Sequence, residues 1–235
     1  MKRHEDAAGF RAAPEEERGV FYIYEAPVRL WHWINAGSII VLAVSGLLIA
    51  HPFPSLMGEA SHHFLMGDVR FVHFVAAWLF AGGFLVRLLW SLLGNEYSRE
   101  LFHLPLGEKS WWQSLAYEAR WNLFLEKRAR KYYGHNPMAQ LAMFVFFVLG
   151  SLLMILTGGA LYAEGLGDGS WADRLFGWVT PLVGQPQDLR TLHHLGMWFI
   201  LVFVVGHIYM AVREDIVGRQ TSVRTMISGF RIFRK

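Results

Sequence analysis

Cysteine is absent from all 235 residues of the chain. Disulfides, iron–sulfur ligation, thiolate-bound haem and covalent CxxCH haem attachment are therefore excluded. Charge is also scarce, because Asp, Glu, Lys and Arg make up only 17% of the residues, whereas about 25% is usual in soluble domains. The charges gather in a few stretches and leave long apolar runs between them, which is the pattern of an integral membrane protein.

Four apolar runs are long enough to cross a hydrocarbon core, which takes about 20 residues of helix. We predict these spans at about residues 33–50, 71–93, 138–162 and 193–212. The second span contains a single charge, Arg87. The sequence therefore predicts an all-α fold, an integral membrane four-helix bundle in which residues 1–235 form one domain.

The basic residues predict how the bundle is oriented. Eighteen Lys and Arg residues lie before the first span, between the second and third, and after the fourth. Only Arg70, Arg174 and Arg190 lie in the other two loops. By the positive-inside rule, both termini and the long second loop are expected in the cytoplasm. Since the basic residues flank spans instead of forming one face, we expect no nucleic acid partner.

The first 22 residues, MKRHEDAAGFRAAPEEERGVFY, carry charges of both signs and no apolar run before a cleavage site. We therefore expect no removable signal peptide, so the first span itself directs insertion. Residues 1–20 are expected to form a flexible cytoplasmic leader.

The second loop contains KSWWQSLAYEARWNLFLEKR, in which aromatic and basic residues occur together. This composition is typical of an amphipathic helix that lies in the membrane interface and contacts lipid. We expect Trp111, Trp112 and Trp121 to lie at the level of the lipid headgroups.

Histidine placement is the most informative feature of the chain. Of eleven histidines, four lie at or inside the predicted spans: His32, His73, His193 or its neighbour His194, and His207. Imidazole in hydrocarbon is costly unless it is paired or ligated, so an intramembrane histidine indicates a functional site. The histidines outside the spans, among them His62, His63 and His135, are expected to be solvated loop residues, although His62 and His63 could also bind a metal.

Spacing arranges the intramembrane histidines at two depths. Fourteen residues of helix separate His193 from His207, which corresponds to a rise of about 21 Å and a return to nearly the same face. With the predicted orientation, His32 is level with His207 near the cytoplasm, and His73 is level with His193 near the outside. His194 is rotated by about 100° from that face, so the spacing favours His193.

Two imidazoles at one depth are suited to hold a six-coordinate haem for electron transfer, with no open position for oxygen chemistry. We therefore predict an inner haem iron between His32 and His207, and an outer haem iron between His73 and His193. The second ring nitrogen of each ligand is expected to donate to a carbonyl or a water.

Three further residues are candidates for contact with the haems. Gly46 follows His32 by fourteen residues, where a missing side chain lets a flat macrocycle approach, or where it serves ordinary helix packing. Arg87 and Arg29 can each pair with a haem propionate or simply extend to the membrane edge.

Several strings resemble one known family. They are YEAPVRLWHW, MGDVRFVHF, GNEYSRELF, KSWWQSLAYEARWNLFL, GHNPMAQLAMF, HHLGMW and VGHIYMAVRED, which together extend from about Tyr22 to Phe230. The chain resembles the b-type cytochrome subunit of membrane-bound nickel–iron uptake hydrogenases. RLWHW also recurs in the cytochromes of formate dehydrogenases, whereas the second-loop and fourth-span strings are specific to the hydrogenase group.

The resemblance implies a cytochrome of the cytoplasmic membrane with two haems b, ligated at the positions of His32, His73, His193 and His207. It implies as partners an iron–sulfur small subunit and a nickel–iron large subunit outside the membrane, with quinone as the diffusible electron acceptor. The chain would then be the electron-transfer subunit of a hydrogen:quinone oxidoreductase complex and would not itself activate hydrogen.

Two alternatives remain open at this stage. One is an equivalent cytochrome b subunit of a formate dehydrogenase or another periplasmic reductase. The other is a membrane anchor without haem. A transporter is disfavoured, because the spans lack the paired broken helices expected of inverted repeats.

Overall fold

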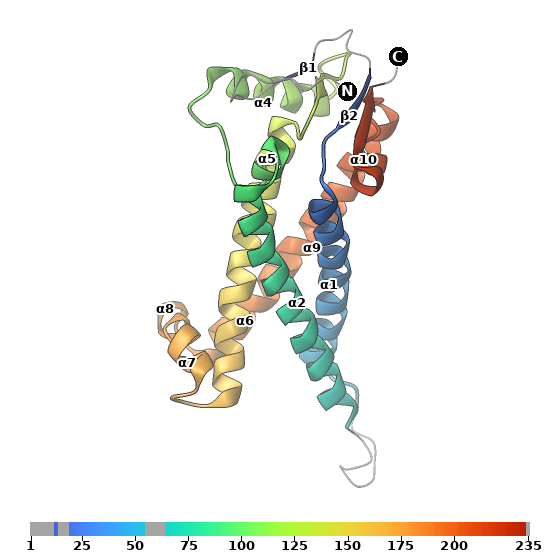
Figure 1. The fold of residues 1–235 in the computed structure, drawn as a ribbon. Helices are drawn as coiled ribbons and strands as arrows, with labels where there is room; N and C mark the ends of the chain where they lie inside the picture. The colour runs from blue at the N-terminus through green and yellow to red at the C-terminus, as the bar shows by residue number, and fades with distance from the viewer. Residues whose placement is uncertain (1–11, 14–18, 55–63, 234–235) are drawn as a thin grey trace. The chain divides into compact units, whose positions relative to one another are not determined.

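The computed structural model describes residues 12–13, 19–54 and 64–233, and it contains four helical segments long and apolar enough to cross a membrane. These are α1 (Ala26–Ala50), α2 (Leu65–Leu93), the segment Pro137–Leu166, and α9 (Pro186–Ile216) (Figure 1). Each predicted span lies within one of them. The prediction of an all-α integral membrane protein is confirmed.

Prolines account for the positions at which these helices begin. Pro27 is the second residue of α1, and Pro186 is the first residue of α9. A first-turn proline loses no helical hydrogen bond, because its missing N–H would have no partner there. The helices consequently begin before the apolar runs, and His32 and His193 lie about two turns inside them.

The third span changes helix type along its length. It begins as α5 (Pro137–Ala142), where the Asn136 side chain accepts a hydrogen bond from the main-chain N of Ala139 at 2.8 Å. It continues as a π-helix (Met143–Leu149) and ends as α6 (Gly150–Leu166). A π-helical stretch shifts which residues face a given side, and nothing in the sequence pattern predicted it.

The chain forms two compact units. Unit 1 comprises Met1–Arg29, Trp90–Val145 and Val205–Lys235, and unit 2 comprises Leu30–Leu89 and Phe146–Val204. Unit 2 therefore contains most of α1 and α2, all of α6 and the first part of α9.

Small residues allow α6 and α9 to pack closely in unit 2. A Cβ at Gly150 would lie 3.4 Å from Ile200, and the ring of Phe146 stacks on that of Phe199 with centroids 4.6 Å apart. Close backbone approach at glycine is the usual way in which membrane helices associate.

The segment predicted as the third loop is largely helical. It contains α7 (Trp171–Phe176) and α8 (Val179–Val183), and α9 already begins at Pro186. Val179 of α8 and Leu189 of α9 are buried against Ala160 of α6, which holds this segment onto the span.

Unit 1 contains the short elements outside the spans. They are α3 (Glu96–Arg99), α4 (Lys109–Asn122), α10 (Ser222–Ser228), and two antiparallel strand pairs: β1 (Ala12–Ala13) with β3 (Lys131–Tyr132), and β2 (Gly19–Tyr22) with β4 (Phe230–Phe233). β2 and β4 thus join the two ends of the chain. Residues 1–11 and 14–18 of the expected leader, like His62 and His63, lie outside the described residues.

Helix α4 forms where an interfacial helix was predicted, but two of its tryptophans are not at a lipid surface. Trp111 and Trp121 are 0% and 4% exposed, whereas Trp112 is 49% exposed. The Trp111 indole donates to Gln140 Oε1 at 2.8 Å, and the Arg213 guanidinium lies 3.7 Å from the centroid of the Trp121 ring. Trp111 and Trp121 therefore do not contact lipid, contrary to the interfacial prediction, and their depth at the headgroups stays a prediction.

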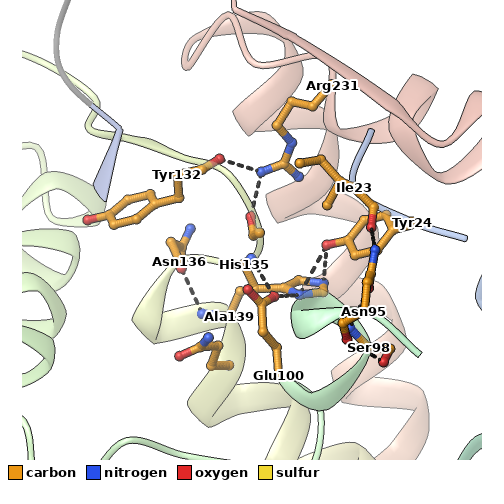
Figure 2. Close-up of polar contacts among 12 residues, drawn as sticks. Ile23, Tyr24, Asn95, Ser98, Glu100, Tyr132, His135, Asn136, Ala139 and Arg231 are labelled. Carbon is orange, nitrogen blue, oxygen red and sulfur yellow. Dashed lines mark hydrogen bonds and ion pairs between the residues drawn. The ribbon is translucent and has the colours of Figure 1, made fainter. Parts of the chain in front are cut away.

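His135 was also predicted incorrectly, since it is an anchored residue and not a solvated one (Figure 2). Its Nδ1 lies 2.9 Å from Glu100 Oε2, and its Nε2 lies 3.0 Å from the Tyr24 hydroxyl. Nearby, Arg231 Nη1 donates to the Tyr132 carbonyl at 2.7 Å and Asn95 Nδ2 donates to the Ile23 carbonyl at 2.8 Å. These bonds tie together segments from both ends and the middle of the chain.

Glu118 on α4 is an ionisable carboxyl group buried inside unit 1. It is 1% exposed and accepts a hydrogen bond from the Tyr132 hydroxyl at 2.9 Å. Burial raises the pKa of Glu118 from 4.5 to about 7; neighbouring Glu214 acts in the same direction, and Arg130 and Arg213 oppose it along with the Tyr132 bond.

We predict that Glu118 makes the protein less stable as pH rises. Its pKa is higher in the folded than in the unfolded chain, so its contribution is fully present below about pH 4.5 and is lost as pH rises through about 7. Thermal unfolding in nanodiscs between pH 5 and pH 8 measures this loss. Glu118→Gln, which cannot ionise, should show a shallower decline of Tm, and a decline parallel to that of the unsubstituted protein would contradict the assignment.

Candidate cofactor site

His73 of α2 is held by a hydroxyl from α1. The Ser45 Oγ lies 2.9 Å from His73 Nδ1, and the same Oγ donates to the Val41 carbonyl at 2.6 Å. Ser45 is 5% exposed, so the bond lies inside the protein.

His193 of α9 is held in the same way by a hydroxyl from α6. The Thr157 Oγ1 lies 2.8 Å from His193 Nδ1 and donates to the Leu153 carbonyl at 2.7 Å. Thr157 is 1% exposed. Each of the two histidines thus has its Nδ1 occupied by a buried hydroxyl of a neighbouring helix.

The two imidazoles belong to one site in unit 2. His73 and His193 are close enough to interact electrostatically. A Cβ at Gly46 would lie 3.5 Å from Cε1 of His73 and 3.8 Å from Sδ of Met197, and a Cβ at Gly158 would lie 3.0 Å from Cε1 of His193. The contact at Gly158 is tight, so a side chain there would displace the His193 ring, whereas the distances at Gly46 are ordinary van der Waals contacts.

These features fit a haem with two axial imidazoles. Since Nδ1 of each ring is engaged by a hydroxyl, Nε2 is the nitrogen left for an iron, as is usual when a second partner fixes the orientation of a ligating histidine. The prediction of a carbonyl partner holds for His73, which has a hydrogen bond with the Leu42 carbonyl, and the Ser45 and Thr157 hydroxyls are partners that were not predicted.

His194 has a different environment from His193. The Trp198 indole donates to Nε2 of His194 at 3.1 Å, and the His51 ring lies 6.4 Å away between centroids. A ring whose Nε2 already accepts a hydrogen bond is a poorer candidate ligand. The choice of His193 over His194 stays a prediction, and this hydrogen bond of His194 is an argument for it.

The other predicted pair is divided between the two units. His32 belongs to unit 2, where its ring meets that of Trp33 edge-on with centroids 5.0 Å apart. His207 belongs to unit 1, where it interacts electrostatically with His135. The pairing of His32 with His207 stays a prediction.

The two arginines proposed for propionate contacts have protein partners. Arg87 is 4% exposed and its guanidinium lies 5.5 Å from the centroid of the Trp31 ring in unit 2. Arg29 Nη1 donates to the Ile227 carbonyl of α10 at 2.6 Å in unit 1. Arg87 is therefore buried among protein side chains, and both predicted roles, contact with a propionate and extension to the membrane edge, stay open.

Sequence reasoning missed Ser45, Thr157, Gly158 and Met197. The available signal was a hydroxyl residue inside an apolar span, but several such residues exist and most only bond to their own helix. Which hydroxyl faces a histidine of another helix depends on helix rotation, which the hydrophobic pattern does not fix.

Four apolar spans and the paired imidazoles of His73 and His193 are the features expected of a membrane cytochrome. The family described as "Prokaryotic cytochrome b561" matches residues 23–229. The chain belongs to this family, and a b-type cytochrome implies haem b as the cofactor.

Curated relatives resemble nearly the whole chain. The chain is 58% identical over 213 residues to the "Probable Ni/Fe-hydrogenase B-type cytochrome subunit" of Azotobacter vinelandii, covering 91% of this chain and 89% of the relative. The protein of that name from Rhodobacter capsulatus is 50% identical over 214 residues, covering 91% and 82%. The "Probable Ni/Fe-hydrogenase 1 B-type cytochrome subunit" of Escherichia coli K12 is 46% identical over 215 residues, covering 89% and 90%.

We predict that Gly158→Ala weakens haem retention about tenfold or more, the range found when the support of a metal ligand is disturbed. The new Cβ would lie 3.0 Å from Cε1 of His193, so the ring, which Thr157 holds at Nδ1, must shift by a few tenths of an ångström. Haem b content of the purified protein measures the effect. Gly165→Ala on the same helix is the control, because no atom lies within 4 Å of a Cβ there; equal haem content in the two variants would refute the prediction.

Proposed function

We propose that the chain is a dihaem cytochrome b that anchors a periplasmic nickel–iron hydrogenase and passes electrons from its iron–sulfur small subunit to quinone. The observation that carries the proposal is the His73–His193 pair, fixed through both Nδ1 atoms, in a chain 46–58% identical to proteins named as hydrogenase cytochrome subunits. The printed names of those relatives supply the hydrogenase partner.

The ligands proposed for the outer haem are His73 and His193, and those for the inner haem are His32 and His207. A haem b held by two imidazoles would supply one-electron redox chemistry, with no open position for oxygen chemistry. Gly46 makes room beside His73, and Arg87 and Arg29 are proposed to lie near the haem carboxylates, where guanidinium groups are favourable partners.

The protein's own contribution is to hold these groups inside hydrocarbon. Moving a charge through the bilayer core is costly, so electron transfer there needs resident centres. In this proposal the spans provide imidazoles at two depths, and the buried hydroxyls of Ser45 and Thr157 hold the rings of His73 and His193. Neither histidine pair offers the chemistry that activates hydrogen, which we assign to the nickel–iron large subunit.

The proposed location is the cytoplasmic membrane, with both termini on the cytoplasmic side. This follows from the excess of Lys and Arg in unit 1, which includes the ends of the chain and the second loop. The outer haem is then nearer the hydrogenase, the inner haem is nearer the cytoplasm, and lipid surrounds the spans.

A formate dehydrogenase cytochrome is the nearest alternative function. Three relatives from different bacteria carry hydrogenase names and match about nine-tenths of this chain, which favours the hydrogenase partner. Co-purification with a nickel–iron large subunit distinguishes the two alternatives.

We predict two haems b per polypeptide in a pyridine haemochrome assay of the purified protein. His73→Ala and His193→Ala should each leave one, because only the outer site loses a ligand. His194→Ala should keep both, since its Nε2 accepts from Trp198. Finding one haem in the unsubstituted protein would show that one of the two histidine pairs does not bind haem. Finding none would leave the membrane anchor without haem as the remaining alternative.

Hydrogen-dependent reduction of quinone in membrane vesicles should be lost in His73→Ala. The hydrogenase itself should still reduce a soluble dye at the normal rate, because hydrogen activation is assigned to the partner. Normal hydrogen-to-quinone activity in His73→Ala would show that electrons do not pass through the outer site.

A further inference from the structure

We infer that Ser45 and Thr157 are positioning residues that select which ring nitrogen of His73 and His193 is available to the outer haem. The inference rests on the proposed function, because it concerns the ligands of that haem. It adds two residues from α1 and α6 to a site otherwise defined by α2 and α9.

Counting hydrogens identifies the tautomer of each histidine. The Ser45 hydroxyl has one hydrogen, and the 2.6 Å separation of its oxygen from the Val41 carbonyl oxygen requires that hydrogen to lie between them. Two oxygens without a hydrogen between them would repel at this distance. The 2.9 Å contact with His73 is therefore a bond in which Nδ1–H donates to Oγ, beside the Leu42 carbonyl, which also hydrogen-bonds His73.

The same count applies to the second histidine. The hydrogen of Thr157 lies toward the Leu153 carbonyl, at 2.7 Å, so Oγ1 accepts from Nδ1–H of His193 at 2.8 Å. Two histidines on different helices thus each donate from Nδ1 to a hydroxyl. In both cases that hydroxyl donates to the carbonyl four residues earlier in its own helix. Both Nε2 atoms keep their lone pairs for a metal.

Ser38 shows that a hydroxyl bonded to a carbonyl of its own helix does not by itself contact a histidine. Its Oγ donates to the Ile34 carbonyl at 2.9 Å, and it is 6% exposed, on the same helix as Ser45. Within residues 12–13, 19–54 and 64–233, however, its hydroxyl meets no imidazole. Ser38 is consequently a matched control for the loss of a buried hydroxyl from α1.

Donation from Nδ1–H has two expected consequences for the haem. It holds the ring in one orientation, and it makes the opposite nitrogen a stronger electron donor, which stabilises the oxidised iron. Removing the acceptor should therefore raise the midpoint potential of the outer haem and weaken its retention.

The test uses the full chain with haem bound, in nanodiscs, carrying Ser45→Ala or Thr157→Val. We expect haem transfer to apomyoglobin to be about 10–100-fold faster, the range for loss of a partner behind a ligand. One of the two haem potentials should rise in a redox titration. Ser45→Thr and Thr157→Ser, which keep the hydroxyl, should restore both properties, and Ser38→Ala should leave them unchanged.

Ser45→Cys and Thr157→Cys provide a second pair in case the first fails to fold, because a thiol is close in size and a weak acceptor. The inference would be overturned if Ser45→Ala and Thr157→Val, or the two Cys variants, released haem at the rate of Ser38→Ala and had the same haem potentials. That result would leave the proposed function intact. Absence of haem from the unsubstituted protein would instead refute the proposed function.

Discussion

An imidazole inside a bilayer must have both of its nitrogens satisfied, and the arrangement of unit 2 follows from that constraint. Each of His73 and His193 has its Nδ1 bonded to a hydroxyl from the neighbouring helix. The hydroxyls of Ser45 and Thr157 in turn donate to carbonyls of their own helices, so both hydroxyls have hydrogen-bond partners within the protein and need no water. An iron at the remaining nitrogens completes this chain of contacts, which is why the site fits a haem-binding protein.

The spans were readable from the sequence, because hydrocarbon permits few alternatives, whereas the two depths of the histidines stay a prediction. Length, charge distribution and fourteen-residue spacing identified four helices and the ligand candidates. Rotation of one helix against another was not readable, so the hydroxyls facing His73 and His193 went unnoticed. The hydrophobic pattern leaves rotation open when a helix is apolar on all sides.

Outside the spans, sequence composition was misleading for a physical reason. A basic, aromatic segment was predicted to lie on lipid, but Trp111 bonds to Gln140 and Trp121 contacts Arg213. Tryptophan is suited both to a membrane interface and to a polar, buried contact, and only tertiary structure distinguishes them. His135 is similar, because its partners Glu100 and Tyr24 are distant in sequence.

A density map of the purified protein with its cofactor, by electron cryo-microscopy, tests the central claim most directly. The account predicts a porphyrin whose iron is bonded to Nε2 of both His73 and His193, with Ser45 and Thr157 still at the Nδ1 atoms. A map in which these two rings share no iron, or bind it through Nδ1, would contradict the account.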